Sequence, residues 1–228
     1  MPSLPPVTKN LMLICVAAFC LSLVLPLTGW LALWPLASGN FMPWQLLSYA
    51  LLHGDTSHLF FNMLGLWMFG AELERLWGRN RYLQFLAVTV LTAAAAQLLV
   101  TFVMGSMGPT VGASGALYGL LLAYALSFPR RMFDLVGFLP MLLFMVPSQT
   151  LNIVGVVLYV MLMTNRQAVP IPPVYVKALT MVAIFGAVEF LLGMFFRSGI
   201  AHFAHLGGML GGWLMVLYWR RAGTRRRR

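Results

Sequence analysis

The chain has 228 residues, of which 61% are hydrophobic and 9% are charged, and its formal net charge is +10 at pH 7. Soluble domains carry roughly 25% charged residues, so this composition excludes an ordinary water-soluble protein and indicates that a lipid bilayer surrounds most of the chain. The basic residues flank apolar stretches, which is typical of the cytoplasmic ends of membrane spans and not of a nucleic-acid interface. We therefore expect membrane lipids as partners and no nucleic acid.

Six apolar segments are candidate membrane spans, because a span needs about 20 apolar residues. They cover residues 11–30, 59–77, 82–104, 115–128, 178–196 and 200–218. The fourth segment is short. At 1.5 Å per residue, a helix from Gly112 to Phe128 is about 25 Å long, so we expect its outer end to lie below the membrane surface, with room for water above it.

A further apolar stretch, residues 133–164, separates the fourth span from the fifth, and Pro140, Pro147 and Ser148 interrupt it. One extra crossing would reverse the orientation of everything after it, and the stretch is too short for two crossings. We therefore predict a re-entrant or interfacial helical insertion at about residues 132–169. The membrane domain is predicted to cover residues 1–221, and residues 222–228 to form a basic cytoplasmic tail.

The basic residues also predict the orientation of the spans. If the N-terminus is inside and the spans alternate, every lysine and arginine except Arg197 faces the same side. Such asymmetry marks the cytoplasmic face. The sequence thus predicts a multi-pass integral protein of a bacterial inner membrane with both termini in the cytoplasm.

Three polar residues are expected at a similar depth, because His58, Ser114 and His205 lie near the outer ends of spans that run from outside to inside. Polar groups are expensive in lipid and mark candidate functional sites. Ser114 is the candidate nucleophile: Gly112 and Gly115 beside it permit close approach of a substrate, and a helix N-terminus there favours an oxyanion. Packing of small residues between helices is the alternative interpretation of this motif.

His205 is the candidate general base, which would make a Ser–His dyad without a carboxylate. Gly208 and Gly212 follow it at a spacing of four, and Gly115 lies on the fourth span; small residues at this spacing allow helices to pack tightly. This packing is expected to bring His205 to Ser114. A structural histidine bonded to the backbone is the alternative.

Three further residues are expected around the dyad. His58 and Asn62 are four residues apart and face one side of a helix, so both are candidate oxyanion donors together with the backbone N–H of Ser114. Tyr118 lies one turn after Ser114 and is expected to pack on the ring of His205. The histidines are not accompanied by cysteine or carboxylate ligands at metal-site spacing, so we expect neither a metal nor a cofactor.

These residues resemble the motifs of the rhomboid family of intramembrane serine proteases, from about Trp44 to the sixth span. The motifs, in order, are Trp44-Gln45 (where the family usually has Trp-Arg), His58-x-x-x-Asn62, Gly70-x-x-x-Glu74-x-x-x-Gly78, Gly112-x-Ser114-Gly115-x-x-Tyr118 and Ala204-His205-x-x-Gly208-x-x-x-Gly212. The resemblance implies an all-α, polytopic bundle of six transmembrane helices with a Ser114–His205 dyad. It also implies structural roles for Glu74, at the inner end of the second span, and for Trp44, in the first outer loop.

The predicted function is that of an intramembrane serine endopeptidase that hydrolyses single-span membrane proteins within or near the outer part of the bilayer. Two alternatives remain: a non-catalytic rhomboid-like module that binds membrane proteins, and a small transporter or channel. Glu189, a carboxylate within the fifth span, is the best argument for the transporter. We expect instead a structural role, in which Glu189 makes a hydrogen bond to a neighbouring helix.

Overall fold

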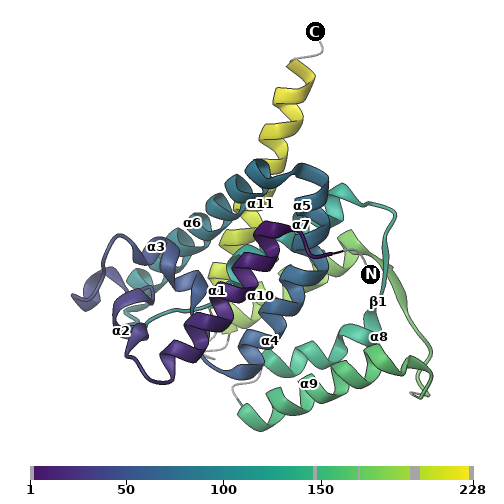
Figure 1. Cartoon of the computed structure of the whole chain (residues 1–228), viewed down its shortest axis with the longest axis horizontal. Helices are drawn as coiled ribbons and strands as arrows, with labels where there is room; N and C mark the ends of the chain where they lie inside the picture. Colours follow the sequence, from purple (N-terminus) through teal and green to yellow (C-terminus); the bar gives the residue numbers. More distant parts are fainter. Residues whose placement is uncertain (1–2, 146–147, 169, 196–200, 226–228) are drawn as a thin grey trace. The chain divides into compact units, whose positions relative to one another are not determined.

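The computed structural model describes residues 3–145, 148–168, 170–195 and 201–225 (Figure 1). The chain is mostly helical and folds as two compact units. The first contains residues 1–124 and 203–228, and the second contains residues 125–202. Arg197, the expected outward-facing cation, and residues 226–228 of the expected basic tail lie outside the described residues.

The first unit begins with helix α1 (Pro6–Ser22), in which proline occupies the first position. Proline suits a helix start because its missing N–H needs no partner there and its φ is already helical. The expected span at residues 11–30 was wrong in its bounds: the chain turns after Ser22, and a separate short helix, α2 (Leu27–Leu31), follows Pro26. Proline disfavours the helical conformation of the residue before it, which explains the break.

The outer-loop elements and the second span follow in chain order. They are η1 (Leu36–Ser38), α3 (Gln45–Ser48), η2 (Tyr49–Leu51), α4 (Thr56–Gly65), the π-helical segment η3 (Leu66–Gly70) and α5 (Ala71–Trp77). The last three succeed one another without a gap and cover the segment expected as the second span. Asp55 caps α4, because its carboxylate accepts the backbone N–H of His58 at 2.8 Å, which is the bond an N-cap residue supplies.

Three helices of this unit meet through small residues: α6 (Arg79–Met104), the start of α7 (Ser114–Ser127) and α11 (His202–Arg225). A methyl group at Gly208 would collide with the backbone carbonyl of Gly115, and one at Gly212 would lie 2.9 Å from the carbonyl oxygen of Gly119. Absent side chains therefore let the backbones of α7 and α11 touch, as the glycine spacing predicts.

The N-terminal segment, the α5–α6 turn and the last turns of α11 meet at one end of this unit. The Glu74 carboxylate accepts the backbone N–H groups of Val7 at 2.9 Å and Thr8 at 2.7 Å, and the Thr8 hydroxyl at 2.8 Å. The rings of Trp77 and Trp219 lie 5.1 Å apart. Glu74 thus joins α5 to the start of α1. Figure 1 shows α11, in yellow, continuing past the end of α5, and its helix runs to Arg225, beyond the expected domain boundary at residue 221.

The second unit is built on the stretch between the fourth and fifth spans. Its elements are β1 (Met132–Asp134), α8 (Leu135–Phe138), η4 (Leu139–Met145), α9 (Gln149–Thr164), η5 (Arg166–Ala168), β2 (Tyr175–Lys177) and α10 (Ala178–Phe195). The strands pair antiparallel with Phe133 opposite Val176, so the expectation of purely α-helical structure missed one small sheet. The segment α8–η4 contacts α9, which makes the insertion a pair of packed helical segments closed at its base by the sheet.

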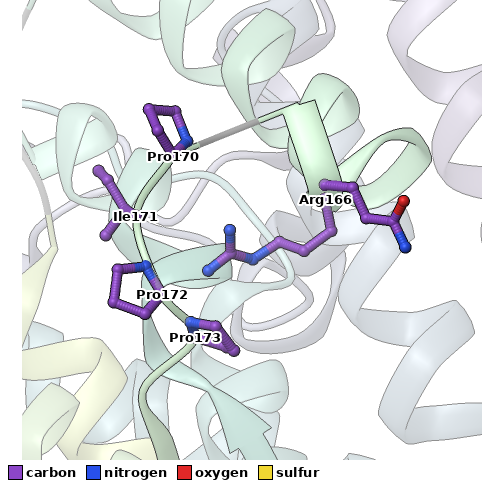
Figure 2. Close-up of a pocket in the computed structure, with 6 residues that line it drawn as sticks. Arg166, Pro170, Ile171, Pro172 and Pro173 are labelled. Carbon is purple, nitrogen blue, oxygen red and sulfur yellow. The ribbon is translucent and has the colours of Figure 1, made fainter.

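Asp134 organises the base of the insertion. Its carboxylate caps α8 through the N–H of Val136, accepts the N–H of Val174, and pairs with Arg166 at 2.6 Å. Beside this pair lies an open cavity of about 450 Å³. Figure 2 shows the Arg166 side chain extending toward the chain segment that carries Pro172 and Pro173, which line the cavity with Gln167, Pro170 and Ile171. The cavity contains none of the expected site residues.

Among the described residues, two helices are long and apolar enough to cross a membrane by length and composition: α6 and α10. Three shorter apolar helices, α1, α7 and α9, have 14 to 17 residues. A helix of 14 residues spans about 21 Å at 1.5 Å per residue, which is less than the roughly 30 Å hydrocarbon layer. The helix α7, at the position of the fourth expected span, is therefore shorter than this layer.

Candidate active site

Ser114 and His205 face each other in the first unit. Ser114 begins α7, His205 lies in the first turn of α11, and the distance from Nε2 of His205 to Oγ of Ser114 is 2.8 Å. The His205 side chain is buried, with 7% exposed, whereas Ser114 is half-buried. If the Ser114 hydroxyl donates and Nε2 accepts, a nucleophile and its base are in hydrogen-bond contact.

The glycine-lined seam produces this contact. Beyond the Gly208–Gly115 contact, a methyl group at Gly115 would lie 2.5 Å from Cβ of Ala93 and 3.3 Å from the Ala204 carbonyl oxygen. A larger residue at either glycine would separate α7 from its neighbours. Ser114 directly precedes Gly115 in sequence, and Ala204 directly precedes His205. The close approach of Gly115 to Ala204 therefore lies beside the Ser114–His205 hydrogen bond.

Tyr118 packs on His205, as the sequence predicts. The two ring centroids are 4.3 Å apart and the ring planes differ by 7°, which is a stacked arrangement. Tyr118 lies one helical turn after Ser114 on α7, so the same helix supplies the hydroxyl that contacts Nε2 and the ring that covers the imidazole face. The imidazole is thereby restrained both in its plane and in its direction.

His58 lies next to the Ser114 backbone. Gly112 has φ +124°, a conformation that favours glycine, and a methyl group there would lie 2.6 Å from Nε2 of His58 and 3.6 Å from Oγ of Ser114. The N–H of Gly54 donates to Nδ1 of His58 at 3.4 Å. Since Nδ1 accepts, the proton of the neutral ring is on Nε2, the nitrogen that faces Gly112 and Ser114.

Asn62 is buried one turn after His58, with 3% of its surface exposed. Its amide nitrogen donates to the backbone carbonyl of His58 at 2.8 Å. A primary amide carries two N–H groups, so this bond orients the side chain and leaves one N–H for a further acceptor. The Asn62 carbonyl oxygen has no hydrogen-bond partner among the described residues.

His53 packs against the ring of His58. It is buried, and its ring centroid is 5.1 Å from that of His58, with the rings edge to face. Burial is the main reason that the pKa of His53 is lowered to about 3; the charge of a protonated His58 acts in the same direction, and the Leu51 carbonyl and Asp55 oppose it. His53 is therefore neutral near pH 7 and packs as an uncharged ring.

Gln45 anchors the outer loop, a role that the sequence did not reveal. The side chain is fully buried; its oxygen accepts the N–H groups of Trp34 at 3.3 Å and Met42 at 3.1 Å, and its nitrogen donates to the carbonyls of Trp30 at 3.3 Å and Asn40 at 3.1 Å. Trp44, expected to be structural, donates its indole N–H to the Trp30 carbonyl at 2.9 Å. The sequence signal for this role of Gln45 was its position directly after Trp44, where the rhomboid family usually has arginine.

Glu189 on α10 forms a hydrogen bond with His202, whose role the sequence left undecided. Its Oε2 lies 2.6 Å from Nδ1 of His202, the first residue of α11, and both side chains are buried. This agrees with the expected hydrogen bond from Glu189 to a neighbouring helix. The sequence did not single out His202 as the partner, because the two residues are 13 positions apart and a helix end, whose geometry no motif specifies, lies between them.

The architecture and this cluster define a helical, strongly apolar protein in which a buried histidine contacts a half-buried serine. A family model, the Rhomboid domain, matches residues 40–160, more than half of the chain. The chain belongs to the rhomboid family. It is similar to proteins named Rhomboid protease GlpG from Yersinia pestis (strain Pestoides F) and from Yersinia pseudotuberculosis serotype O:3 (strain YPIII), each 30% identical over 120 residues, or 51% of this chain and 41% of the relative.

Another relative is Rhomboid protease GluP from Bacillus subtilis (strain 168), which is 39% identical over 92 residues, or 40% of this chain and 17% of the relative. The chain therefore aligns with less than half of the length of these curated relatives. Family membership is established by the domain match, and it confirms the resemblance seen in the sequence motifs.

Proposed function

We propose that this protein is an intramembrane serine endopeptidase that hydrolyses peptide bonds of single-span membrane proteins within or near the outer part of the bilayer. The observation that carries the proposal is the 2.8 Å contact between Ser114 Oγ and His205 Nε2 at the start of a short apolar helix. The family relatives named as proteases add support.

In the first chemical step, Oγ of Ser114 attacks the carbonyl carbon of the scissile peptide bond while Nε2 of His205 takes the hydroxyl proton. The C–N bond then breaks, and the His205 imidazolium returns the proton to the departing amine. An acyl-enzyme ester on Ser114 remains. Stacking on Tyr118 holds the imidazole in place through both proton transfers.

The oxyanion of the tetrahedral intermediate is stabilised by N–H groups around Ser114. The backbone N–H at the first position of α7 has no acceptor within its own helix turn. Nε2–H of His58 and the second N–H of Asn62 are the further donors, and donors of this kind are worth most in a dry, preorganised site. The Gly54–His58 and Asn62–His58 hydrogen bonds preorganise both side chains.

In the second step, water attacks the acyl-enzyme with His205 as base, and the free Ser114 hydroxyl is restored. A peptide bond inside a helix is shielded by its own side chains and hydrogen bonds, so the substrate needs a locally unwound segment. Because α7 is short, Ser114 at its start would lie below the membrane surface and leave a route for the water that hydrolysis consumes.

The membrane arrangement that serves this reaction has six crossings, both termini in the cytoplasm of a bacterial cell, and an insertion that enters the membrane without crossing it. Six spans in this orientation put His58, Ser114 and His205 at one depth on the outer side. The continuity of α4, η3 and α5 over one predicted span supports the second crossing.

A fluorophosphonate probe tests the proposal, because such probes modify activated serines. We expect the purified wild-type protein in lipid to be labelled at Ser114, and labelling to be lost in Ser114→Ala and His205→Ala. Ser127→Ala, on the same helix, is the matched control and should be labelled normally. Cleavage of a single-span substrate should follow the same pattern. A folded wild-type protein that neither reacts with the probe nor cleaves would support the binding-module or transporter alternatives.

A further inference from the structure

A second buried polar pair lies outside the proposed dyad. Glu189 is 1% exposed and His202 is 3% exposed, and Oε2 of Glu189 lies 2.6 Å from Nδ1 of His202. The mechanism proposed above uses neither residue. Glu189 is the one ionisable residue in the sequence of α10, whose other side chains are apolar or small.

A contribution to stability alone does not explain why Glu189 and His202 form a buried pair. Taking a carboxylate and an imidazole out of water is costly, and apolar residues of similar volume in place of a buried ion pair are often neutral or stabilising. An ionisable group in a membrane segment is therefore a candidate for function. Unlike an apolar contact, the pair fixes the relative orientation of its two side chains. A hydrogen bond at 2.6 Å sets both the distance and the angle between its donor and acceptor groups.

The direction matters because of where His202 lies. His202 is the first residue of α11, and His205 is three residues later, so the two side chains emerge from neighbouring positions on the same helical face. A carboxylate beside the first turn of a helix also meets the positive end of the helix dipole. A tie at His202 thus acts on the same turn that carries the proposed base.

Small residues determine how closely the first turn of α11 approaches its neighbours. Ala204, Gly207 and Gly208 set how closely α11 approaches its neighbours, through contacts with backbone and small side chains. Residues without long side chains do not interlock, so they restrict the rotation of the first turn weakly. The 2.8 Å contact between His205 and Ser114 depends on how that turn is rotated.

We propose that Glu189 and His202 are positioning residues for His205: their hydrogen bond sets the orientation of the first turn of α11 in which Nε2 meets the Ser114 hydroxyl. This inference rests on the proposed function of Ser114 and His205. One proton lies between the two side chains, on Nδ1 if His202 donates or on the carboxyl if Glu189 donates, and either arrangement makes the same tie.

The decisive variant replaces the pair by apolar residues, as Glu189→Met combined with His202→Phe. Because such replacements of buried pairs are often neutral or stabilising, the double variant should melt no lower than the wild type. We expect its kcat for a single-span substrate to fall about 10-fold to 100-fold with KM within about threefold of the wild-type value, because a small misplacement of a catalytic group has an effect of that size. A double variant that melts no lower and retains wild-type kcat overturns the proposal.

Conservative and neighbouring variants sharpen the test. Glu189→Gln keeps an acceptor for Nδ1–H, so it should retain most of kcat, whereas Glu189→Leu should lose as much as the double variant. Phe190→Leu is the matched control on α10, because Phe190 is 51% exposed, and it should behave as wild type. Equal kcat values for Glu189→Gln and Glu189→Leu, both as low as the double variant, would contradict positioning by a hydrogen bond.

The rate of fluorophosphonate labelling separates this proposal from the proposed function. A wild-type protein that is not labelled at Ser114 refutes the proposed function. A wild-type protein that is labelled, together with a double variant labelled at the same rate and to the same extent, refutes the positioning role and leaves the proposed function standing.

Discussion

In the proposed mechanism, Asn62 differs from Ser114 and His205 because it contributes one of several oxyanion donors, whereas each member of the proposed dyad is required for bond making. Removing a single oxyanion donor typically lowers kcat about 10²-fold to 10³-fold. We expect Asn62→Ala to lower kcat by that factor with little change in KM, since its N–H acts on charge that develops after binding. The measurement is the steady-state rate on a model single-span substrate in lipid.

The neighbouring residue supplies the control for this prediction. Met63→Leu changes an adjacent buried side chain with similar volume and should keep wild-type kinetics. His58→Ala should resemble Asn62→Ala, and the backbone N–H of Ser114 should keep both above the activity of Ser114→Ala. A rise in KM at constant kcat in either variant would instead identify a substrate-binding residue.

His53 predicts a pH dependence of stability that is distinct from that of activity. Its pKa is lowered to about 3 in the folded protein, chiefly by burial, whereas the ordinary value is about 6.5. Between these values the unfolded chain binds a proton that the folded protein excludes, so folding stability is complete above about pH 6.5 and declines as the pH falls toward 3. Melting temperatures measured from pH 8 to pH 4 should show this decline.

His53→Leu should flatten this part of the curve. Neither ring nitrogen makes a hydrogen bond of ordinary geometry with the described residues, so an apolar replacement of similar size should leave the melting temperature near pH 8 almost unchanged. The difference in melting temperature between His53→Leu and wild type should therefore grow as the pH falls. A constant difference at every pH would show that His53 is not the group responsible.

The single residues that the sequence identified share one property: they are polar where the surrounding stretch is apolar. Ser114, His205 and His58 stand out in this way, and the structure brings all three together. Gln45 and Thr8 do not stand out, because they lie in loops or at a helix start where polar residues are ordinary. Gln45 donates to the distant backbone carbonyl of Trp30, and Thr8 donates to the distant carboxylate of Glu74. Both bonds depend on tertiary packing, which spacing along the chain does not encode.

At the level of helices, the glycine seam links packing to chemistry. A methyl group at Gly208 would overlap the backbone carbonyl of Gly115, and backbone atoms yield only if α7 and α11 move apart. Overpacking of this kind typically costs about 1–3 kcal/mol. We expect Gly208→Ala to lower both the melting temperature and kcat, because the same separation lengthens the Ser114–His205 contact.

Gly29→Ala is the matched control, because Gly29 is also helical and has nothing within 4 Å of its would-be side chain. Alanine favours a helix over glycine by roughly 0.5–1 kcal/mol, so this variant should be neutral or slightly stabilising. Wild-type melting temperature and kcat in Gly208→Ala would mean that the seam tolerates a side chain and does not set the distance between the proposed catalytic groups.

Helix ends were predicted less well than helix centres, for a local reason. Residues 11–30 are hydrophobic almost throughout, so hydrophobicity did not predict where α1 ends. The break before Pro26 follows instead from the backbone geometry of proline. Similarly, apolar composition predicted helical structure over residues 133–164. The described part of that stretch begins in β1 and then forms α8, η4 and α9. The pairing of Phe133 with Val176 escaped prediction because three-residue strands carry too few residues to show a period of two.

On the scale of the whole molecule, contacts within the first unit bear on its orientation in the membrane. Arg75 donates to the Ser3 carbonyl at 3.0 Å, and the guanidinium of Arg81 lies 5.8 Å from the ring centroid of Trp219. The N-terminal segment, the α5–α6 turn and the last turns of α11 therefore share one end of this unit. The α5–α6 turn and the end of the sequence of α11 carry clusters of arginines, and the N-terminal segment carries Lys9.

A shared end predicts a shared side of the membrane. Basic residues near span ends are retained in the cytoplasm, so we expect both termini to be cytoplasmic, and a fluorescent reporter that matures only in the cytoplasm should be bright when fused after Arg228. The same reporter inserted between Pro172 and Pro173 should also be bright, because the 133–164 insertion is predicted to return to the side from which it enters.

A reporter inserted in the loop before His53 is the control and should be dark. A dark insertion at Pro172 together with a dark C-terminal fusion would show that the 133–164 segment crosses the membrane, because one extra crossing reverses everything after it. A bright insertion at Pro172 with a dark C-terminal fusion would refute the predicted orientation of α11.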